Sequence, residues 1–170
     1  MSYPPATQAQ PMSYPSPATR AGRGQAGVVG LVLTAVGAIA LVLGYTALEW
    51  YKASESQHAK LSDLRSIVHL PGFPSGFPKA FFGWLDWVLL GAVIAFAIIA
   101  NLPSPTATAF RVLTPLVGAA GIAGILLALN DQALSNGHIF TNAWLGLYAS
   151  LAGFLIVGIA GVIGPQRANR

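Results

Sequence analysis

Four long apolar runs constrain this chain more than any other feature. They cover about residues 26–48, 84–102, 112–129 and 143–163. At about 1.5 Å per residue, each run forms a helix that can cross the roughly 30 Å hydrocarbon core of a bilayer. The runs are continuous and do not alternate apolar with polar residues, which excludes a membrane β-barrel. The sequence therefore predicts an all-α integral membrane protein, an antiparallel bundle of four transmembrane helices.

The composition agrees with this fold class. Charged residues make up only 8% of the chain, whereas an average soluble domain carries about a quarter. The chain has no cysteine, which excludes disulfide bonds, Cys-ligated zinc, iron–sulfur clusters and thiol catalysis. We expect no cofactor.

Three further segments surround the spans. Residues 1–25 are rich in proline and lack an apolar run, so they predict a disordered cytoplasmic tail that precedes the 26–163 membrane domain. Residues 49–83 form one long outer loop, and residues 164–170 form a short basic tail. These boundaries define the expected domain organisation.

The basic residues predict the orientation. With four spans, the two tails and the second loop share one side, which holds five cations and no acid: Arg20, Arg23, Arg111, Arg167 and Arg170. The other side holds all five acids and four cations, so the raw count is nearly even, but four of the first side's five cations flank helix ends directly. Because Lys and Arg next to helix ends favour the cytoplasm, we expect a multi-pass protein of the bacterial inner (plasma) membrane with both termini cytoplasmic.

The outer loop has two parts. Up to Leu70 it has helical character, since Leu61, Leu64 and Val68 fall at helical spacing, with Ile67 as a further candidate. This pattern predicts an amphipathic helix that lies on the bilayer or on its own bundle, or alternatively a docking surface for a partner.

The second part, residues 71–78, contains Gly-Phe-Pro twice. Its prolines and glycines exclude a helix, and its phenylalanines favour the membrane interface or the helix ends. We predict that a partner contacts this part of the chain through Phe73, Pro74, Phe77, Pro78, Phe81 and Phe82.

Small residues recur in the first span. Gly30, Gly37 and Gly44 are seven residues apart, and Thr34 shares their side. Such faces let helix backbones approach closely in lipid. This seam either closes the chain's own bundle or binds a partner's transmembrane helix, and we predict the partner contact. The second span has only Gly91 and is expected to face lipid.

The sequence offers little for catalysis. No ionisable residue lies at mid-depth in a span, where proton relays and ion paths place one. Asp86 falls in the first turn of the second expected helix, which favours dipole stabilisation. The three histidines, His58, His69 and His138, lack the spacing of metal ligands. We therefore expect a non-enzymatic protein with no catalytic, cofactor-binding or metal site.

The size, composition and four-span layout resemble the small actinobacterial accessory membrane subunits of the mycobacterial Mce lipid-import machinery. The resemblance implies a non-catalytic accessory or assembly subunit of a larger cell-envelope complex for lipid import. Its partners would be membrane lipid and that complex, reached through the helices and the outer loop, with no nucleic acid. Two alternatives stay open. One is a structural subunit of a respiratory complex, and the other is an interfacial lipid-handling enzyme or carrier that uses His58, Asp63, His69 and Asp86.

Overall fold

The structure, a computed structural model, describes residues 27–54, 57–74, 76–131, 134 and 140–163. Both predicted tails, and His138 in the third loop, lie outside the described residues.

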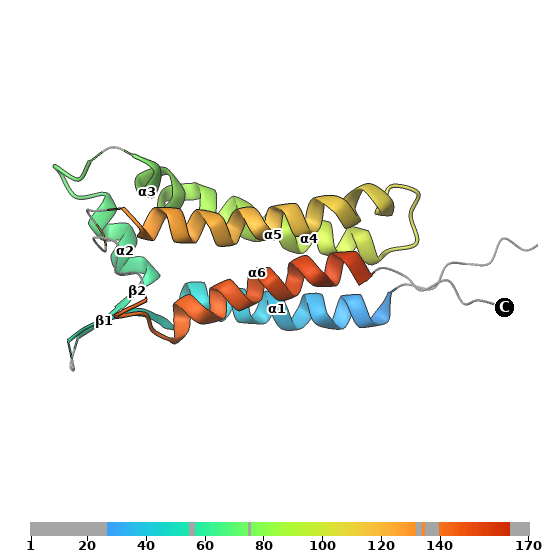
Figure 1. The fold of residues 1–170 in the computed structure, drawn as a ribbon, viewed down its shortest axis with the longest axis horizontal. Coiled ribbons are helices and arrows are strands. Elements are labelled where there is room, and N and C mark those ends of the chain that lie inside the picture. The colour runs from blue at the N-terminus through green and yellow to red at the C-terminus, as the bar shows by residue number, and fades with distance from the viewer. Residues whose placement is uncertain (1–26, 55–56, 75, 132–133, 135–139, 164–170) are drawn as a thin grey trace, which may run out of the picture.

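Four helices in the described part of the chain are long and apolar enough to cross a membrane. They are α1 (Val28–Thr46), the continuous helix Phe77–Asn101, α5 (Ala107–Leu129) and α6 (Leu145–Ile163). The four predicted spans are thus confirmed as helices. The start of α1 and the end of α6 lie at the same end of the bundle (Figure 1), which we name the terminal end.

The four helices form two pairs that pack on one another. α1 lies beside α6, and α4 (Asp86–Asn101) lies beside α5 (Figure 1). α6 also packs against α5 and α4. Half of its apolar stretch is buried inside the bundle, a larger fraction than in the other three long helices. α6 is therefore the central helix of the bundle.

The second span begins earlier than predicted. A helical turn, α3 (Phe77–Ala80), and a π-helical turn, η1 (Phe81–Leu85), lead into α4 without a break. The prediction that prolines exclude a helix through residue 78 is wrong for its last two residues. Pro78 lies in the first turn, where backbone N–H groups have no helical acceptor, so its missing N–H removes no bond.

α5 also begins earlier, at Ala107 and not at residue 112. The predicted apolar run began just after Arg111, whereas in the structure Arg111 lies inside the helix. Its Nε donates to the carbonyl of Ala100 on α4 at 3.4 Å. A long basic side chain at a helix end reaches polar groups without interrupting the helix.

The first loop contains a hairpin that the sequence did not predict. β1 (Glu49–Ser54) pairs antiparallel with β2 (Gln57–Lys60), and α2 (Leu61–Val68) follows directly. The predicted helical character is therefore wrong for residues 49–60 and confirmed for 61–68. Leu61, Leu64 and Val68 are all buried, as their spacing predicted.

β1 also binds the chain just before α6. The Lys52 N–H donates to the Asn142 carbonyl at 3.0 Å, and the Trp144 N–H donates to the Trp50 carbonyl at 2.9 Å. These bonds satisfy backbone groups of β1 on the side away from β2. The first and third loops are thereby joined at one end of the bundle, which we name the cap end.

An aromatic layer fills the bundle at the cap end. Its members are fully or almost fully buried: Tyr45, Trp50, Phe81, Phe82 and Phe154. Neighbouring rings meet edge to face with centroids 5.3–6.4 Å apart, the arrangement that ring quadrupoles favour. Trp50 also donates from Nε1 to the Gly44 carbonyl at 2.6 Å. The layer ties the loops to α1, α4 and α6.

We expect Gly37→Leu to lower the free energy of unfolding by about 3 kcal/mol, because overpacking a tight helix contact forces backbone shifts. A Cβ at Gly37 would lie 2.6 Å from Val157 Cγ2 and 3.1 Å from the Gly153 carbonyl oxygen. Denaturant unfolding in detergent micelles measures the loss. The control is Val36→Leu on the exposed side of α1, and equal stability of the two variants would contradict the packing described here.

Candidate functional site

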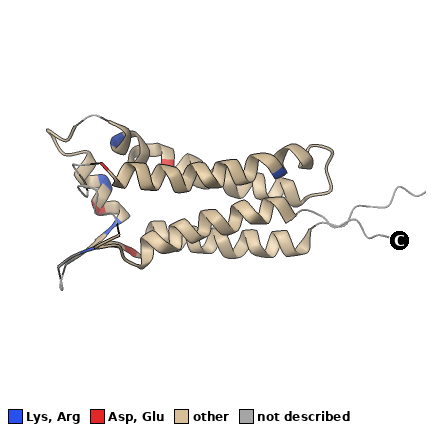
Figure 2. Ribbon diagram, viewed as in Figure 1, with Lys and Arg blue, Asp and Glu red and all other residues tan. Residues whose placement is uncertain are grey.

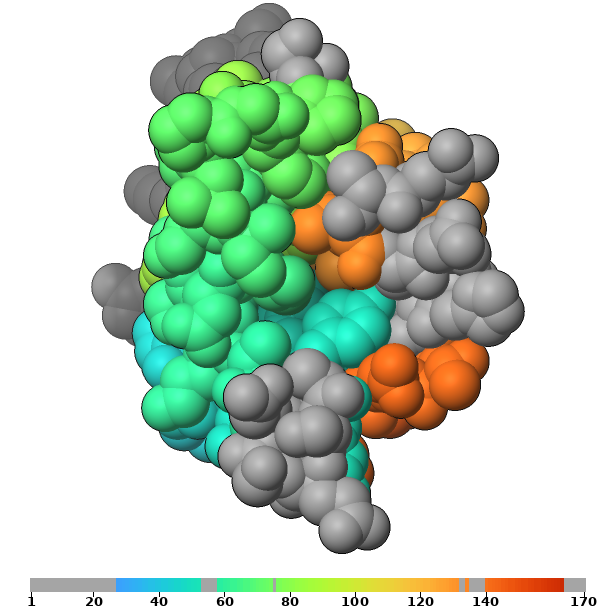
Figure 3. Space-filling model, turned by 90° about the vertical axis from the view of Figure 1, so that its left-hand side faces the viewer, coloured from blue at the N-terminus to red at the C-terminus, as the bar shows by residue number. Residues whose placement is uncertain are grey.

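The hairpin, α2 and the segment 69–76 form a cap over one end of the bundle. Figure 3 looks onto this end, and α2 with the segment that follows it covers one half of the view. Most described charged residues lie at this end (Figure 2). Arg111 lies near the start of α5, beside Ala100 at the end of α4. The cap is thus the polar part of the described chain.

One ion pair fastens the cap to the second span. Arg65 Nη2 on α2 donates to both carboxylate oxygens of Asp86 on α4, at 3.0 and 2.7 Å. Asp86 is fully buried, and its Oδ1 also accepts the Trp87 N–H at 2.8 Å. The Arg65 guanidinium lies 5.0 Å from the centre of the Trp87 ring. A buried carboxylate needs such a partner, because an unpaired buried charge is strongly destabilising.

This geometry replaces the role expected for Asp86. Asp86 lies in the first turn of α4, as expected, but α3 and η1 lead into that turn without a break, so Asp86 is not at a free helix end. Its partner Arg65 lies 21 residues earlier in the sequence, and no sequence pattern indicates that the two residues meet. Asp86 is a structural anchor for α2.

Two hydrogen-bonding atoms near this pair have no partner among the described residues. They are Tyr45 Oη and Arg65 Nε, both buried. The Tyr45 ring meets the Trp87 ring edge to face at 5.8 Å, so Tyr45 and Arg65 contact the same indole. Such atoms are rare in folded proteins and need an explanation.

The other residues of the alternative enzyme site, His58, Asp63 and His69, each make a local contact of their own. His58 Nδ1 lies 3.0 Å from Glu49 Oε2 across the hairpin. Asp63 accepts the Lys60 N–H at 2.7 Å and caps α2. His69 Nδ1 lies 2.7 Å from the Arg65 carbonyl oxygen. The residues that the structure describes contain no group of three or more side chains that could together hold a metal ion.

Tyr51, on β1, is a further partly buried phenol. Burial raises its pKa to about 12. The phenol therefore stays neutral at physiological pH, and it contributes packing and not charge to the cap.

The predicted partner seam on α1 is buried inside the chain. Gly37 and Gly44 face Gly153 and Ser150 on α6. Thr34, also buried, donates to its own helix at the Gly30 carbonyl. The chain itself covers this face, because α6 packs against Gly37 and Gly44, and Asn101 at the end of α4 lies against Gly30. The partner contact has to be sought on another face.

Asn101, which the sequence analysis passed over, closes this seam at the terminal end. It is fully buried, and its Nδ2 donates to the carbonyls of Ala97 at 2.8 Å and of Ala160 at 3.1 Å. Its own carbonyl accepts the Gly27 N–H at 3.0 Å, and its side chain lies against Gly30. An amide in an otherwise apolar run is the signal that could have identified this residue.

The predicted outer-loop contact residues divide into two groups. Phe81, Phe82 and Pro78 are buried within the chain and belong to its core. Phe77 and Pro74 are exposed, and Phe73 is half-buried. Only the second group can contact a partner in this conformation.

The clearest open surface in the described part of the chain surrounds Gly91. For each of the other ten glycines in α1, α4, α5 and α6, a Cβ would come within 4 Å of atoms from another part of the chain; at Gly91 it would meet nothing. Gly91 lies on an exposed face of α4 that includes Trp84, Val88, Ala95 and Ile98. This glycine has no packing role inside the described chain.

Comparison of the chain with protein-family models, with curated proteins and with solved structures finds no match.

We expect Arg65→Met and Asp86→Leu each to lower the free energy of unfolding by about 2–4 kcal/mol, because each leaves one charge without its partner. The double variant should lose less than the sum of the two single losses. Unfolding of all four proteins in detergent micelles gives the coupling energy. Strictly additive losses would show that the pair does not fasten α2 to α4.

Proposed function

We propose that this protein is a non-catalytic accessory subunit of a larger cell-envelope membrane complex, and that it binds a partner's transmembrane helix along α4. The observation that carries the proposal is Gly91, a span glycine that faces open space in the structure. Lipid import is the process that we assign to the complex, on the strength of the layout described from the sequence.

The argument rests on what glycine does inside a membrane helix. Glycine costs a helix about 1 kcal/mol relative to alanine, and in lipid it allows two backbones to approach closely. The other ten glycines of α1, α4, α5 and α6 are packed against other parts of the chain. A partner helix that packs over Gly91 and Ala95 would use Gly91 for the same kind of close contact.

The exposed face continues in both directions from Gly91. Trp84 and Ile98 are exposed and lie seven residues before and after Gly91. A repeat of seven is the spacing with which one helix contacts another along its length. Trp84, which is 59% exposed, lies where α4 approaches the cap end.

The cap extends this surface beyond the helices. Ile67 and Leu70, at the end of α2 and just after it, are exposed, and Pro74 in the next segment is exposed too. Exposed apolar groups beside charged ones mark interaction surfaces. We propose that the outer contact uses these residues and Phe77, in place of the buried Phe81 and Phe82.

The orientation follows from the charge distribution in the sequence. We propose that the terminal end lies in the cytoplasm and that the cap lies on the opposite side of a bacterial inner membrane. A subunit of a respiratory complex would have the same features, and the identity of the captured partner distinguishes it from the lipid-import subunit.

Photo-crosslinking in native membranes tests the proposed face. A photoreactive residue at Val88, beside Gly91, should give a covalent product with a larger membrane protein. The same residue at Val36 on the exposed side of α1 should give lipid products only. Identical products at the two positions, or a product at Val88 that contains only a second copy of this chain, would contradict the proposal.

A matched variant separates binding from folding. Gly91→Ile should abolish the Val88 product and co-purification in mild detergent, because the side chain blocks close approach of the partner backbone. It should leave the stability of the isolated chain unchanged, because nothing described lies near Gly91. If wild type and Gly91→Ile co-purify with the same partner equally well, α4 is not the docking face.

Cysteine labelling tests the orientation. A single cysteine in place of Pro74, which is exposed in the cap, should react with a membrane-impermeant maleimide added to intact cells. A reporter fused after Arg170 should be active in the cytoplasm. Protection of the cysteine at position 74 until the cells are lysed would reverse the assigned orientation.

A further inference from the structure

The geometry points to a site at the β1–β2 hairpin that binds the phosphate of a phospholipid headgroup, where Lys52 lies over the ring of Trp144. The site involves the hairpin and the start of α6 and not α4, so it does not depend on the proposed function.

Two basic side chains of the hairpin meet one indole ring. Lys52 on β1 and His58 on β2 are paired across the two strands. Lys52 Nζ lies 5.6 Å from the centre of the Trp144 ring, and the centres of the His58 and Trp144 rings are 5.7 Å apart. Residues directly opposite in an antiparallel pair share one face, so Lys52 and His58 both lie on the face of the hairpin that Trp144 contacts.

The ammonium of Lys52 is the available charge in this cluster. The carboxylate of the cluster, Glu49, is engaged by His58, with 3.0 Å between Oε2 and Nδ1. Neither this pair nor the Arg65–Asp86 pair includes Lys52. An indole ring attracts the positive charge of an ammonium, but the three N–H donors of that ammonium bind oxygen acceptors. Lys52 is therefore available to an anionic oxygen from outside the described residues.

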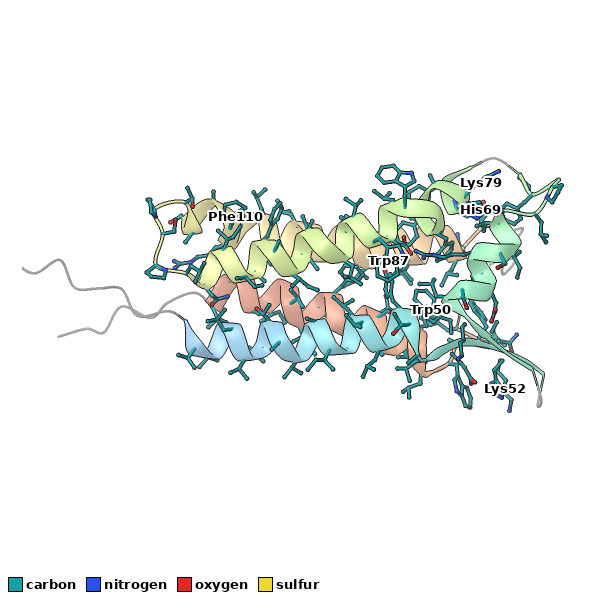
Figure 4. All side chains as sticks on the ribbon, turned by 180° about the vertical axis from the view of Figure 1, so that it is seen from behind. Trp50, Lys52, His69, Lys79, Trp87 and Phe110 are labelled. Carbon is teal, nitrogen blue, oxygen red and sulfur yellow. The ribbon has the colours of Figure 1, made fainter. Side chains whose placement is uncertain are left out.

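The cluster is open at the side of the bundle. β1 and β2 extend past α1 and α6 at the cap end (Figure 1), and Lys52 lies on this extension, on the opposite side of the cap from Lys79 (Figure 4). Trp144 is 41% exposed, His58 is exposed, and Lys52 is half-buried. A ligand beside α6 thus reaches the ammonium without entering the core.

The position of the cluster selects a phospholipid as the source of the oxygen. Trp144 immediately precedes α6, one of the helices that can cross a membrane, so the cluster lies at the depth of the headgroups. Leu145 and Tyr148 are exposed, and the Tyr148 ring stacks on that of Phe140 with centroids 6.5 Å apart. These apolar groups fit the upper part of the acyl chains, which leaves the phosphate level with Lys52.

Native mass spectrometry of the full chain in detergent tests the site. The probes are dioleoylphosphatidylglycerol, dioleoylglycerol, which has the acyl chains but no phosphate, and glycerol phosphate, which has the phosphate but no acyl chains. Wild type should retain the phospholipid in preference to the other two. Lys52→Gln should retain about tenfold less phospholipid, the effect expected for one hydrogen bond between charged groups.

Two further variants separate the site from general charge and from side-chain packing. Lys79→Gln removes an equal charge from an exposed position on the opposite side of the cap and should leave retention unchanged. Lys52→Arg keeps the charge and should retain the phospholipid as wild type does.

Three results would overturn the site. Undiminished retention by Lys52→Gln, or equal losses in Lys52→Gln and Lys79→Gln, would leave no specific contact at Lys52. Equal retention of dioleoylglycerol and the phospholipid by wild type would remove the phosphate contact. Equal retention of glycerol phosphate and the phospholipid would remove the lipid as the source of the phosphate.

Discussion

Close backbone packing on α6 is the constraint on which the rest of the structure depends. Apolar helices gain nothing by leaving lipid for one another, so they associate through packing and interhelical hydrogen bonds. α6 supplies glycines to both sides: Gly153 faces Leu41 and Gly37 on α1, and Gly161 faces Thr114 on α5. α6 therefore joins α1 to the α4–α5 pair.

The cap depends on that bundle for its own structure. An eight-residue helix and a two-stranded hairpin are marginal in isolation, and here they are fixed by the aromatic layer and by the buried Arg65–Asp86 pair. Trp50 belongs to both parts, because its ring is in the core and its Nε1 binds the last turn of α1. The polar groups of the cap thereby hold one arrangement of loops at one end of the bundle.

The proposed function follows from the one helix face that the described bundle leaves uncovered at a glycine. A Cβ at Gly91 would meet no described atom, whereas the ten glycines of α1, α5 and α6 are packed against other parts of the chain. Gly91 therefore points to a second helix, because close backbone packing drives helix association in lipid.

The sequence by itself determined the number and approximate position of the spans, since hydrocarbon thickness sets their length, and the buried face of α2, since helical spacing sets it. Tertiary structure decided which partner each seam has. The spacing of Gly30, Gly37 and Gly44 predicts a face for close helix contact, but it does not indicate whether a helix of the same chain or of another chain packs there. The hairpin and the Arg65–Asp86 pair depend on contacts distant in sequence, and no local periodicity encodes them.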